Sequence, residues 1–267
     1  MQLRRNRIRF GRINHIFISH IHGDHVFGLY GLISSLNLMG RKVPLNIYAP
    51  AGYGEMLTSH LADFDIITDF EIRFVSLCAK DPVKILDEKY VTVTAFPLRH
   101  RIPAYGFLFR EKEKDRKIIR EAIEEFGIPL NQMKHIKKGL DLVKEDGSVI
   151  PNERMTLSPP PPVSYAYCSD TAWFSRLPGF VKGVDLLYHE ATFASSKKEL
   201  ARHTGHSTSE EAAAVALKAG AGKLIIGHFS SRYREIDPLL NEARAIFPDT
   251  VAASEGLTID VADCRRS

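Results

Sequence analysis

Three histidines and an aspartate lie close together near the start of the chain. His20, His22, Asp24 and His25 form the pattern His-Ile-His-Gly-Asp-His directly after His15–Ser19, an apolar run that we expect to be a buried strand. Imidazoles and carboxylates bind zinc and related divalent ions. The alternative is that these are ordinary surface histidines on a loop, but so many ligand-type side chains in six residues favour a metal site. Four ligands in one turn also suit two ions better than one tetrahedral ion. The pattern therefore predicts a metal site.

One loop cannot complete two coordination spheres, so further ligands are expected at other strand ends. His100, Asp170 and His228 each follow an apolar run of the chain. Any one of them alone would fit a hydrogen-bonded structural role better. Together with the histidine cluster they make seven ligands with one shared carboxylate, which fits a two-metal site of the kind that hydrolyses phosphate esters.

Two other clusters have catalytic rather than coordinating character. Glu190 stands in His-Glu-Ala-Thr at the end of an expected strand, and His206 stands in Gly-His-Ser-Thr before an expected helix. A histidine held by a glutamate can donate a proton to a leaving oxygen near neutral pH. A surface carboxylate and a packing histidine are the alternative reading. We expect the pair to act as a general acid.

The elements that must position these residues follow from hydrophobic patterning. Short runs rich in Val, Ile and Tyr predict strands, and longer segments with helical spacing predict helices. Ser207 with Glu210 reads as a capping box for a helix over Glu210–Ala219 that ends at Gly220, and Asp237-Pro238 reads as a cap and first turn. The strands are expected at 15–19, 45–49, 72–77, 91–96, 105–109, 163–168, 184–188 and 223–226, with helices at 26–38 and 52–62. This alternation predicts a single α/β or layered α+β domain over residues 1–267.

Residues 110–162 do not follow that alternation. They carry dense mixed charge, include the basic run Lys134-His135-Ile136-Lys137-Lys138, and end in four prolines. With few apolar residues to bury, the segment is expected to be a protruding insertion rather than part of the core.

Composition excludes several classes of protein. The chain has 267 residues, 44% of them hydrophobic, and a net charge of +4, so wholesale disorder is not expected and a polyanion partner is permitted but not required. No apolar run reaches the 18 or so residues of a membrane-spanning helix, so we expect no membrane association. Three cysteines with no close pair favour a reducing compartment, here the cytoplasm.

Several segments, taken in order, resemble ribonuclease Z, the tRNA 3′-processing endonucleases of the metallo-β-lactamase superfamily. The pattern HxHxDH identifies only the superfamily, whereas the HEAT, HST and HFSSRY segments are specific to ribonuclease Z. The resemblance runs from about Arg4 to about Ala253 and rests on FISHIHGDHVFGLYGLISS, LRHRIPAYGF, SDTAWF, YHEATFA, TGHSTSEEAA and IIGHFSSRY.

The resemblance implies a four-layered αββα fold with two zinc ions per subunit. By motif match, one zinc would be held by His20, His22 and His100, the other by Asp24, His25 and His228, with Asp170 bridging them. A hydroxide activated by the metals would attack the scissile phosphorus of precursor tRNA, leaving a tRNA 3′-hydroxyl. Asp24 would also orient or deprotonate the water, and His206, steadied by Glu190, would protonate the departing 3′ oxygen.

The same resemblance gives the insertion a purpose. Residues 111–162 stand where the family carries a flexible arm that clasps the tRNA elbow, usually across a homodimer. Lys134, Lys137 and Lys138 would then contact phosphates, with an affinity that falls steeply with salt, because duplex RNA is recognised by shape and backbone.

The chain departs from the family pattern at three places. It begins just past the family's usual Cys-Gly-Glu-Gly-Thr-Gln stretch, so we expect the first strands and part of the RNA-contacting surface to be absent. Pro129-Leu130-Asn131-Gln132 replaces an expected Gly-Pro pair in the arm, and Ser169 replaces a glycine before Asp170. Two other functions stay open: a broader phosphodiesterase or arylsulfatase-like hydrolase, and a catalytically weak RNA-binding protein that lacks the first strands.

Overall fold

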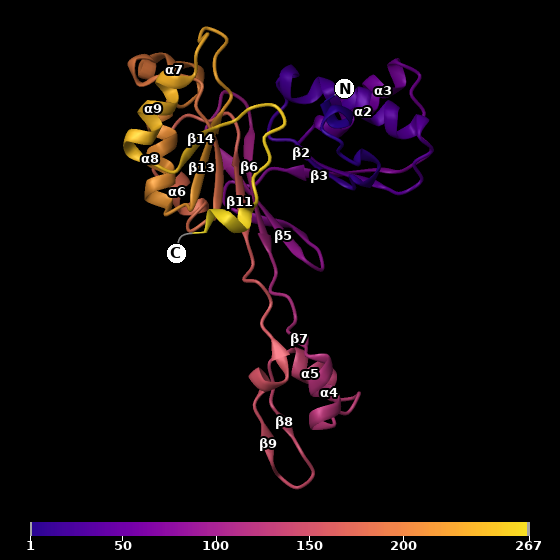
Figure 1. Cartoon of the computed structure of the whole chain (residues 1–267). Helices are drawn as coiled ribbons and strands as arrows, with labels where there is room; N and C mark the ends of the chain where they lie inside the picture. The colour runs from indigo at the N-terminus through magenta and orange to yellow at the C-terminus, as the bar shows by residue number, and fades with distance from the viewer. Residues whose placement is uncertain (1, 266–267) are drawn as a thin grey trace. The chain divides into compact units, whose positions relative to one another are not determined.

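The computed structural model describes residues 2–265, which form two compact units (Figure 1). The first unit contains the residues up to Asp87, then Val93–Phe109, and the residues from Ser164 onward. The second unit consists of Glu88–Thr92 and Arg110–Val163, a range close to that of the expected insertion. Within residues 2–265 no helix is both long and apolar enough to cross a membrane.

The N-terminal part of the first unit is a small parallel sheet covered by two helices. Strands β1 (His15–Phe17), β2 (Leu45–Pro50) and β3 (Ile72–Leu77) pair in that order. Helices α2 (Gly23–Leu38) and α3 (Tyr53–Asp63) lie together over one face of this sheet (Figure 1). The connections are parallel crossovers, which need helices of this kind to return the chain to the same edge.

Helix α2 is built on a helical stripe of apolar residues. Its buried side chains are separated by three or four positions, so they fall on one face. They are Val26, Leu29, Ile33 and Leu36. The sequence predicted a start at Val26, but the helix begins at Gly23. Asp24 and His25 therefore belong to its first turn.

A larger sheet of seven strands forms the rest of the first unit, in the order β14-β13-β12-β11-β6-β5-β4. Its strands are β4 (Val83–Asp87), β5 (Val91–Leu98), β6 (Ala104–Glu111), β11 (Ser164–Cys168), β12 (Leu186–Glu190), β13 (Lys223–Gly227) and β14 (Thr250–Ala252). Strands β11 to β14 are mutually parallel, so their carboxyl ends share one edge of the sheet. Ligand-binding residues are commonly found at such an edge in α/β sheets.

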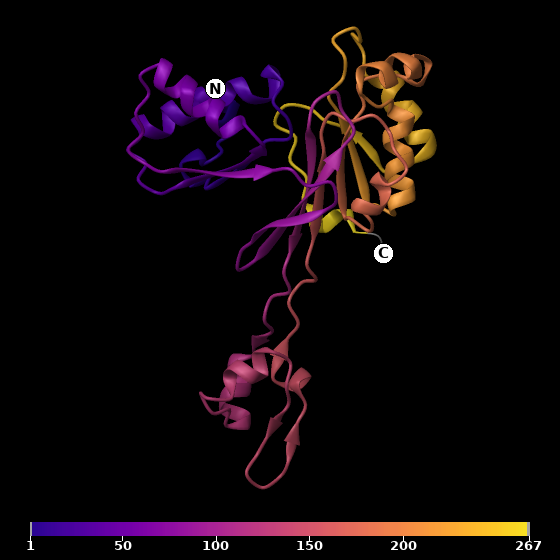
Figure 2. The same ribbon diagram turned by 180° about the vertical axis from the view of Figure 1, so that it is seen from behind.

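Helices cover the outer face of this sheet, as Figure 2 shows from behind. They are α6 (Leu177–Phe180), α8 (Ser209–Ala219) and α9 (Asp237–Ile246), and they share an apolar cluster with β11, β12 and β13. A second cluster joins Tyr48 and Leu77 of the small sheet to Val93 and Phe107 of the large one. The layers therefore run helix, sheet, sheet, helix, which confirms the expected αββα fold.

The remaining elements of the first unit are short. They are α1 (Gln2–Arg5), α7 (Lys198–Thr204) and the 3-10 helices Phe10–Arg12, Ser195–Lys197 and Val261–Cys264.

Both expected helix caps need correction. The capping box of α8 is made by Thr208 and Glu211, because the Ser207 hydroxyl donates instead to the carbonyl of Thr171 at 2.6 Å. Gly220 ends the helix as expected, in the left-handed region with φ 65°. Asp237 is not a cap but lies in the first turn of α9, whose flanking residue is Ile236. Each difference is a shift of one residue.

The second unit contains two helices and two small antiparallel ribbons. Its elements are β7 (Lys117–Ile118), α4 (Arg120–Phe126), α5 (Met133–Lys137), β8 (Leu142–Val143), β9 (Val149–Ile150), β10 (Thr156–Leu157) and a 3-10 turn at Asn152–Arg154. Strand β7 pairs with β10, and β8 pairs with β9.

The expectation that this segment has little to bury is wrong. It has an apolar cluster of its own, made by Ala122, Phe126, Ile128, Ile136, Leu142, Ile150 and Met155. The buried amide of Asn152 donates to the carbonyls of Ile136 and Leu140 at 2.8 and 2.7 Å, which ties α5 to the ribbons. The apolar residues are scattered among charges, and for that reason composition alone did not reveal this core.

Candidate metal centre and adjacent acid

The histidine cluster lies where β1 passes into helix α2. His20 is fully buried at the start of the connecting loop, and His22 is half-buried immediately before the helix. Asp24 and His25 occupy the first turn of α2, where the Asp24 side chain is 70% exposed. A carboxylate in the first turn is favoured by the helix dipole. The loop and the helix start thus direct alternate side chains toward one region.

The three distant residues reach the same region from the large sheet. His100 stands between β5 and β6, Asp170 follows β11, and His228 follows β13. His228 has a φ of 61°, in the left-handed region that few residues other than glycine adopt. Such a conformation stores local strain, and it is found most often at functional sites.

The seven side chains fall into two groups of possible metal ligands. One group contains His20, His22, His100 and Asp170, and the other contains Asp24, His25 and His228. A third group overlaps both and joins Asp170 and His228 to His206. Within each group the nitrogen and oxygen atoms lie within 4.8 Å of one another. The structure therefore brings together all seven residues that the sequence singled out as ligands.

Asp170 lies between the two groups. Its Oδ2 is 3.5 Å from Nε2 of His20 and 3.6 Å from Nε2 of His25, while its Oδ1 is 3.4 Å from Nε2 of His228. Burial alone would raise the pKa of Asp170, but the imidazoles of His25, His228 and His20 hold that pKa well below its usual range. The carboxylate is ionised and can face both groups at once.

The hydrogen-bond status of the histidines fits bound cations. The Nε2 atoms of His20 and His25 are buried and have no hydrogen-bond partner among the described residues. Buried polar atoms without partners are rare and costly, and an ion is one of the explanations for them. Burial, helped by the neighbouring His25, lowers the pKa of His20 to about 3, so this imidazole is neutral and has a free lone pair. Nitrogen and carboxylate donors suit zinc.

A backbone carbonyl orients His100. Its Nδ1 lies 2.7 Å from the carbonyl of Gly205, so Nδ1 carries the proton and Nε2 has the lone pair. That Nε2 lies 3.3 Å from Nδ1 of His22, a separation expected for two lone pairs directed at one ion. Gly205 has a φ of 77°, and a Cβ there would lie 2.9 Å from Nδ1 of His100. Only glycine fits this position without displacing the imidazole.

The hydroxyl of Thr192 orients His228 by the same logic. Its Oγ1 donates to Oε2 of Glu190 at 2.7 Å and therefore accepts from Nδ1 of His228 at 2.9 Å. The Nε2 of His228 is then the atom left with a lone pair, and it faces Asp170. Thr192 also approaches Nδ1 of His206 at 3.3 Å. The sequence analysis placed Thr192 in a motif but gave it no role.

Glu190 holds His206 in a fully satisfied network. The Glu190 side chain is 0% exposed, and its Oε1 lies 2.9 Å from Nδ1 of His206. The carboxylate also accepts from the backbone nitrogens of Thr171, Thr192 and Ser207 at 3.0, 2.9 and 3.1 Å. With Nδ1 directed at Glu190, the other ring nitrogen of His206 is free to serve an incoming group.

The electrostatics of His206 favour its protonated form. Burial lowers the pKa of His206, but the hydrogen bond that His206 donates to Glu190 and the negative charge of that carboxylate outweigh burial, and the net pKa is raised. The ring stacks on that of His228, with centroids 5.4 Å apart, so the histidine stands beside the second ligand group. A cationic histidine at this place can give up a proton to a leaving oxygen.

The lysines assigned to RNA binding lie in the second unit. Lys134 and Lys137 are exposed on helix α5, and Lys138 is exposed just after it. Lys138 pairs with Asp115 at 2.7 Å. Ile136, in the middle of the basic run, is buried in the core of this unit, which turns the neighbouring charges outward.

Comparison with known proteins first gives the class. Residues 1–119 match the model of the beta-lactamase superfamily domain. Two solved structures share the fold. The short form of human tRNase Z matches with a TM-score of 0.64 and 23% identity, over 97% of this chain and 83% of that chain. A metallo-beta-lactamase fold protein of Bacillus subtilis matches with a TM-score of 0.62 and 18% identity, over 93% of this chain and 78% of that chain. The likeness in structure shows the fold alone, that of metallo-beta-lactamase fold proteins.

Sequence relatives narrow the class to one family. The ribonuclease Z of Bacteroides thetaiotaomicron is 47% identical over 98% of this chain and 83% of its own length. That of Parabacteroides distasonis is 45% identical over 98% of this chain and 86% of its own length. The chain belongs to the ribonuclease Z family of endoribonucleases, as its motifs indicated.

Proposed function

We propose that this chain is a zinc-dependent endoribonuclease that removes the 3′ trailer from precursor tRNA and leaves a tRNA 3′-hydroxyl. The observation that carries the proposal is the position of the Glu190–His206 pair beside two ligand groups that share Asp170. A general acid next to a two-metal site is what phosphodiester hydrolysis needs. Membership of the ribonuclease Z family gives the substrate class.

Two zinc ions per subunit would be held by the seven side chains described above. We assign one ion to His20, His22 and His100, the other to Asp24, His25 and His228, and Asp170 to both. Bound there, the ions lower the pKa of an attacking water and neutralise charge that develops on the phosphate.

Asp24 acts on the attacking side of the phosphate. Its carboxylate is largely exposed and lies 3.4 Å from Nε2 of His25, so one oxygen can face an ion while the other faces solvent. A carboxylate in this place can accept a hydrogen bond from the water and direct the water's lone pair at phosphorus. It can also accept the proton as the new bond forms.

His206 acts on the leaving side. Glu190 fixes Nδ1 of the ring, so the free ring nitrogen presents its proton to the departing 3′ oxygen. The raised pKa favours the protonated form of the histidine before the bond breaks. Without this proton the leaving group would depart as an alkoxide, which is far less stable in water.

We assign recognition of the tRNA body to the second unit, as a flexible arm. Lys134, Lys137 and Lys138 are the phosphate contacts of this proposal, supported by their exposure on and after α5. We further propose a homodimer that works in the cytoplasm. Cys78, Cys168 and Cys264 are all free, which agrees with a reducing compartment.

The test is cleavage of a precursor tRNA that carries a 3′ trailer, with and without chelator. The expected result is chelator-sensitive cleavage just after the discriminator base, restored by zinc, with a 3′-hydroxyl on the tRNA. Hydrolysis of a bis-aryl phosphate without cleavage of tRNA would replace the proposal with a small-ester hydrolase. RNA binding without cleavage of either substrate would replace it with a binding protein.

A further inference from the structure

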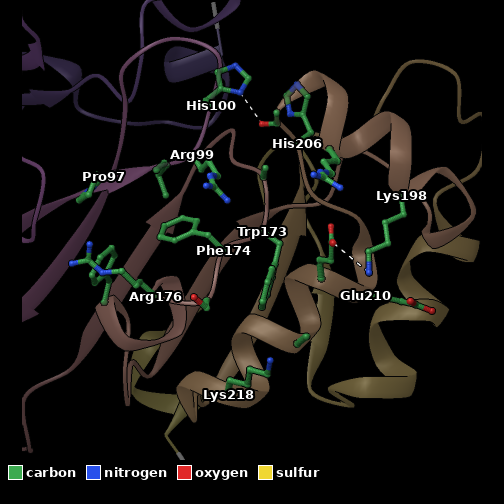
Figure 3. Close-up of a pocket in the computed structure, with 18 of the residues that line it drawn as sticks. Pro97, Arg99, His100, Trp173, Phe174, Arg176, Lys198, His206, Glu210 and Lys218 are labelled. Atoms are coloured by element: carbon green, nitrogen blue, oxygen red, sulfur yellow. Dashed lines mark hydrogen bonds and ion pairs between the residues drawn. The ribbon is translucent and has the colours of Figure 1, made fainter.

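A large pocket opens beside the candidate acid, within the first unit. Its volume is about 1310 Å³, more than the roughly 300–1,000 Å³ typical of small-molecule sites. His100 and His206 stand at one end and Lys218 at the opposite end, with Trp173 and Phe174 between them (Figure 3). Because both His100 and His206 line the pocket, an RNA chain bound at the candidate site can extend into it.

The pocket lining carries an excess of positive charge. Six cationic side chains line it, against the carboxylates of Glu210 and Glu211. The six are Arg99, Arg101, Arg176, Lys198, Arg202 and Lys218. Lys198 lies 3.7 Å from Glu211, and Arg176 pairs with Asp81. Within residues 2–265, Arg99, Arg101 and Arg202 form no ion pair, so their charge is available to a polyanion.

Aromatic rings lie among these charges. Trp173 and Phe174 are only partly buried and line the middle of the pocket. Lys218 places its ammonium 5.2 Å from the centre of the Trp173 ring. Stacking rings interleaved with cations are the features with which proteins hold single-stranded nucleic acid of any sequence.

The walls of the pocket are tied to the candidate centre. The backbone nitrogen of Arg99 donates to Oγ1 of Thr171 at 3.0 Å, and the nitrogen of Ala172 donates to the carbonyl of Arg99 at 2.7 Å. These bonds join the loop that carries His100 to the loop that runs from Asp170 to Trp173. A nucleotide stacked on Trp173 would thus be positioned relative to the residues that hold the scissile phosphate.

We propose that this pocket binds the unpaired 3′ trailer of the RNA substrate, with the bases stacked on Trp173 and Phe174 and the phosphates facing Arg99, Arg101, Arg202 and Lys218. This inference rests on the proposed function. The tRNA body offers one unpaired nucleotide, the discriminator, before its duplex begins. The trailer alone supplies a run of unpaired nucleotides next to the cleaved bond.

A binding measurement tests the pocket without catalysis. Trp173 is the single tryptophan of the chain, so its fluorescence reports on this place alone. Titration of the full chain with a ten-nucleotide unpaired RNA in the presence of chelator should change the Trp173 emission saturably. A double-stranded RNA of the same length should not. Binding of labelled RNA that leaves the tryptophan emission unchanged would overturn the inference.

Variants extend the test to the substrate. Trp173→Leu should raise the KM for a precursor with a ten-nucleotide trailer about tenfold and leave a one-nucleotide trailer almost unaffected, while Trp173→Phe should restore most of the loss. Lys218→Ala should lower the salt dependence of single-strand binding by about 0.7 in log–log slope, the value for one phosphate contact. Lys182→Ala, an exposed lysine outside the pocket, is the matched control.

The outcomes separate this inference from the proposed function. If wild-type protein cleaves precursor tRNA but Trp173→Leu affects long and short trailers equally, the trailer pocket is wrong and the proposed function stands. If no tRNA is cleaved, the fluorescence titration still decides whether the pocket holds single-stranded RNA. A discriminator-side pocket would show itself by a KM that depends on the discriminator base and not on trailer length, which contradicts the trailer assignment. Circular dichroism verifies that each variant is folded.

Discussion

The candidate site has two halves, the acid half around Glu190 and His206 and the metal half around Asp170. They differ in whether their polar atoms already have hydrogen-bond partners. Around Glu190 every contact is made: the buried carboxylate accepts from three backbone nitrogens, the Thr192 hydroxyl and His206. Around Asp170, by contrast, the Nε2 atoms of His20 and His25 are buried without a hydrogen bond to any residue that the structure describes. The acid half is complete as folded, whereas the metal half has buried nitrogen atoms that an ion could satisfy. Loss of metal and loss of the acid should therefore have different signatures.

The largest effect is expected for Asp24→Ala. This change removes a proposed ligand and the group that orients the water, so tRNA cleavage should fall by about a thousandfold or more. Because the Asp24 side chain is 70% exposed, the melting temperature of the chelated protein should hardly move. Cleavage rate, bound zinc and thermal melting are the measurements, with the exposed Asp63→Ala as the control. Full activity in Asp24→Ala would remove this residue from the metal half.

His206→Ala removes the proposed general acid and leaves the proposed metal ligands in place. General acid catalysis contributes about 10²–10⁴-fold, so tRNA cleavage should fall by that amount while zinc content stays unchanged. An aryl phosphate ester with a good leaving group needs no proton and should be hydrolysed at nearly the wild-type rate. Equal losses on both substrates would mean that His206 serves the metal half and not the leaving group.

Glu190→Gln tests the role of His206 as the acid through the pH dependence of cleavage. The carboxylate raises the pKa of His206, so its loss lowers that pKa. A general acid works below its pKa, and therefore activity is lost as pH rises through it. The alkaline limb of kcat for tRNA cleavage should move to lower pH in Glu190→Gln. The variant should also be less stable by about 1–3 kcal/mol, since an amide cannot accept from all the donors around it. An unmoved alkaline limb would contradict the assignment of the acid.

Gly205→Ala tests a place where the two halves meet, because Gly205 directly precedes His206 and its carbonyl accepts a hydrogen bond from His100. The added Cβ would lie 2.9 Å from Nδ1 of His100, and the φ of 77° disfavours alanine. Displacement of this oriented histidine should weaken zinc binding by about 10–100-fold. Zinc titration against a competing chelator measures it. Gly220→Ala, which shares the left-handed conformation but ends helix α8, is the matched control for backbone strain.

The smallest effect on chemistry is expected from the lysines of the second unit. Replacement of Lys134, Lys137 and Lys138 by alanine removes three exposed charges of the second unit. The KM for precursor tRNA should rise, with a weaker dependence on salt, while hydrolysis of a small aryl ester stays unchanged. Unaltered tRNA affinity in this variant would show that the arm assignment is wrong.

Much of the site was readable because its residues terminate strands. His20, Asp170, Glu190 and His228 each follow a run of apolar residues, and parallel strands bring such ends to one edge. The apolar runs also predicted the large sheet, except for β4, whose side chains are all exposed or half-buried, and β14, which has three residues.

The contacts made by loops could not be predicted from the sequence. Ser207 and Thr208 are each followed by a glutamate three residues later, so the sequence allows two capping boxes. The choice is made by the hydrogen bond from Ser207 to Thr171, which is 36 positions away. The roles of Thr192 and Gly205 depend in the same way on which loop lies beside which. The local sequence pattern does not specify partners that lie so far apart in the chain.

The spread of the seven proposed ligands along the chain has a consequence for synthesis. The His20–His25 segment leaves the ribosome first, and His228 follows some 200 residues later. At a synthesis rate of roughly 5–20 residues per second, the early histidines spend ten seconds or more without the rest of their site. During that interval they form an open, histidine-rich peptide, and imidazole ligands suit several transition metals. The proposed site is complete only after β13 has joined the sheet, so any choice among metals by its geometry would come late in synthesis.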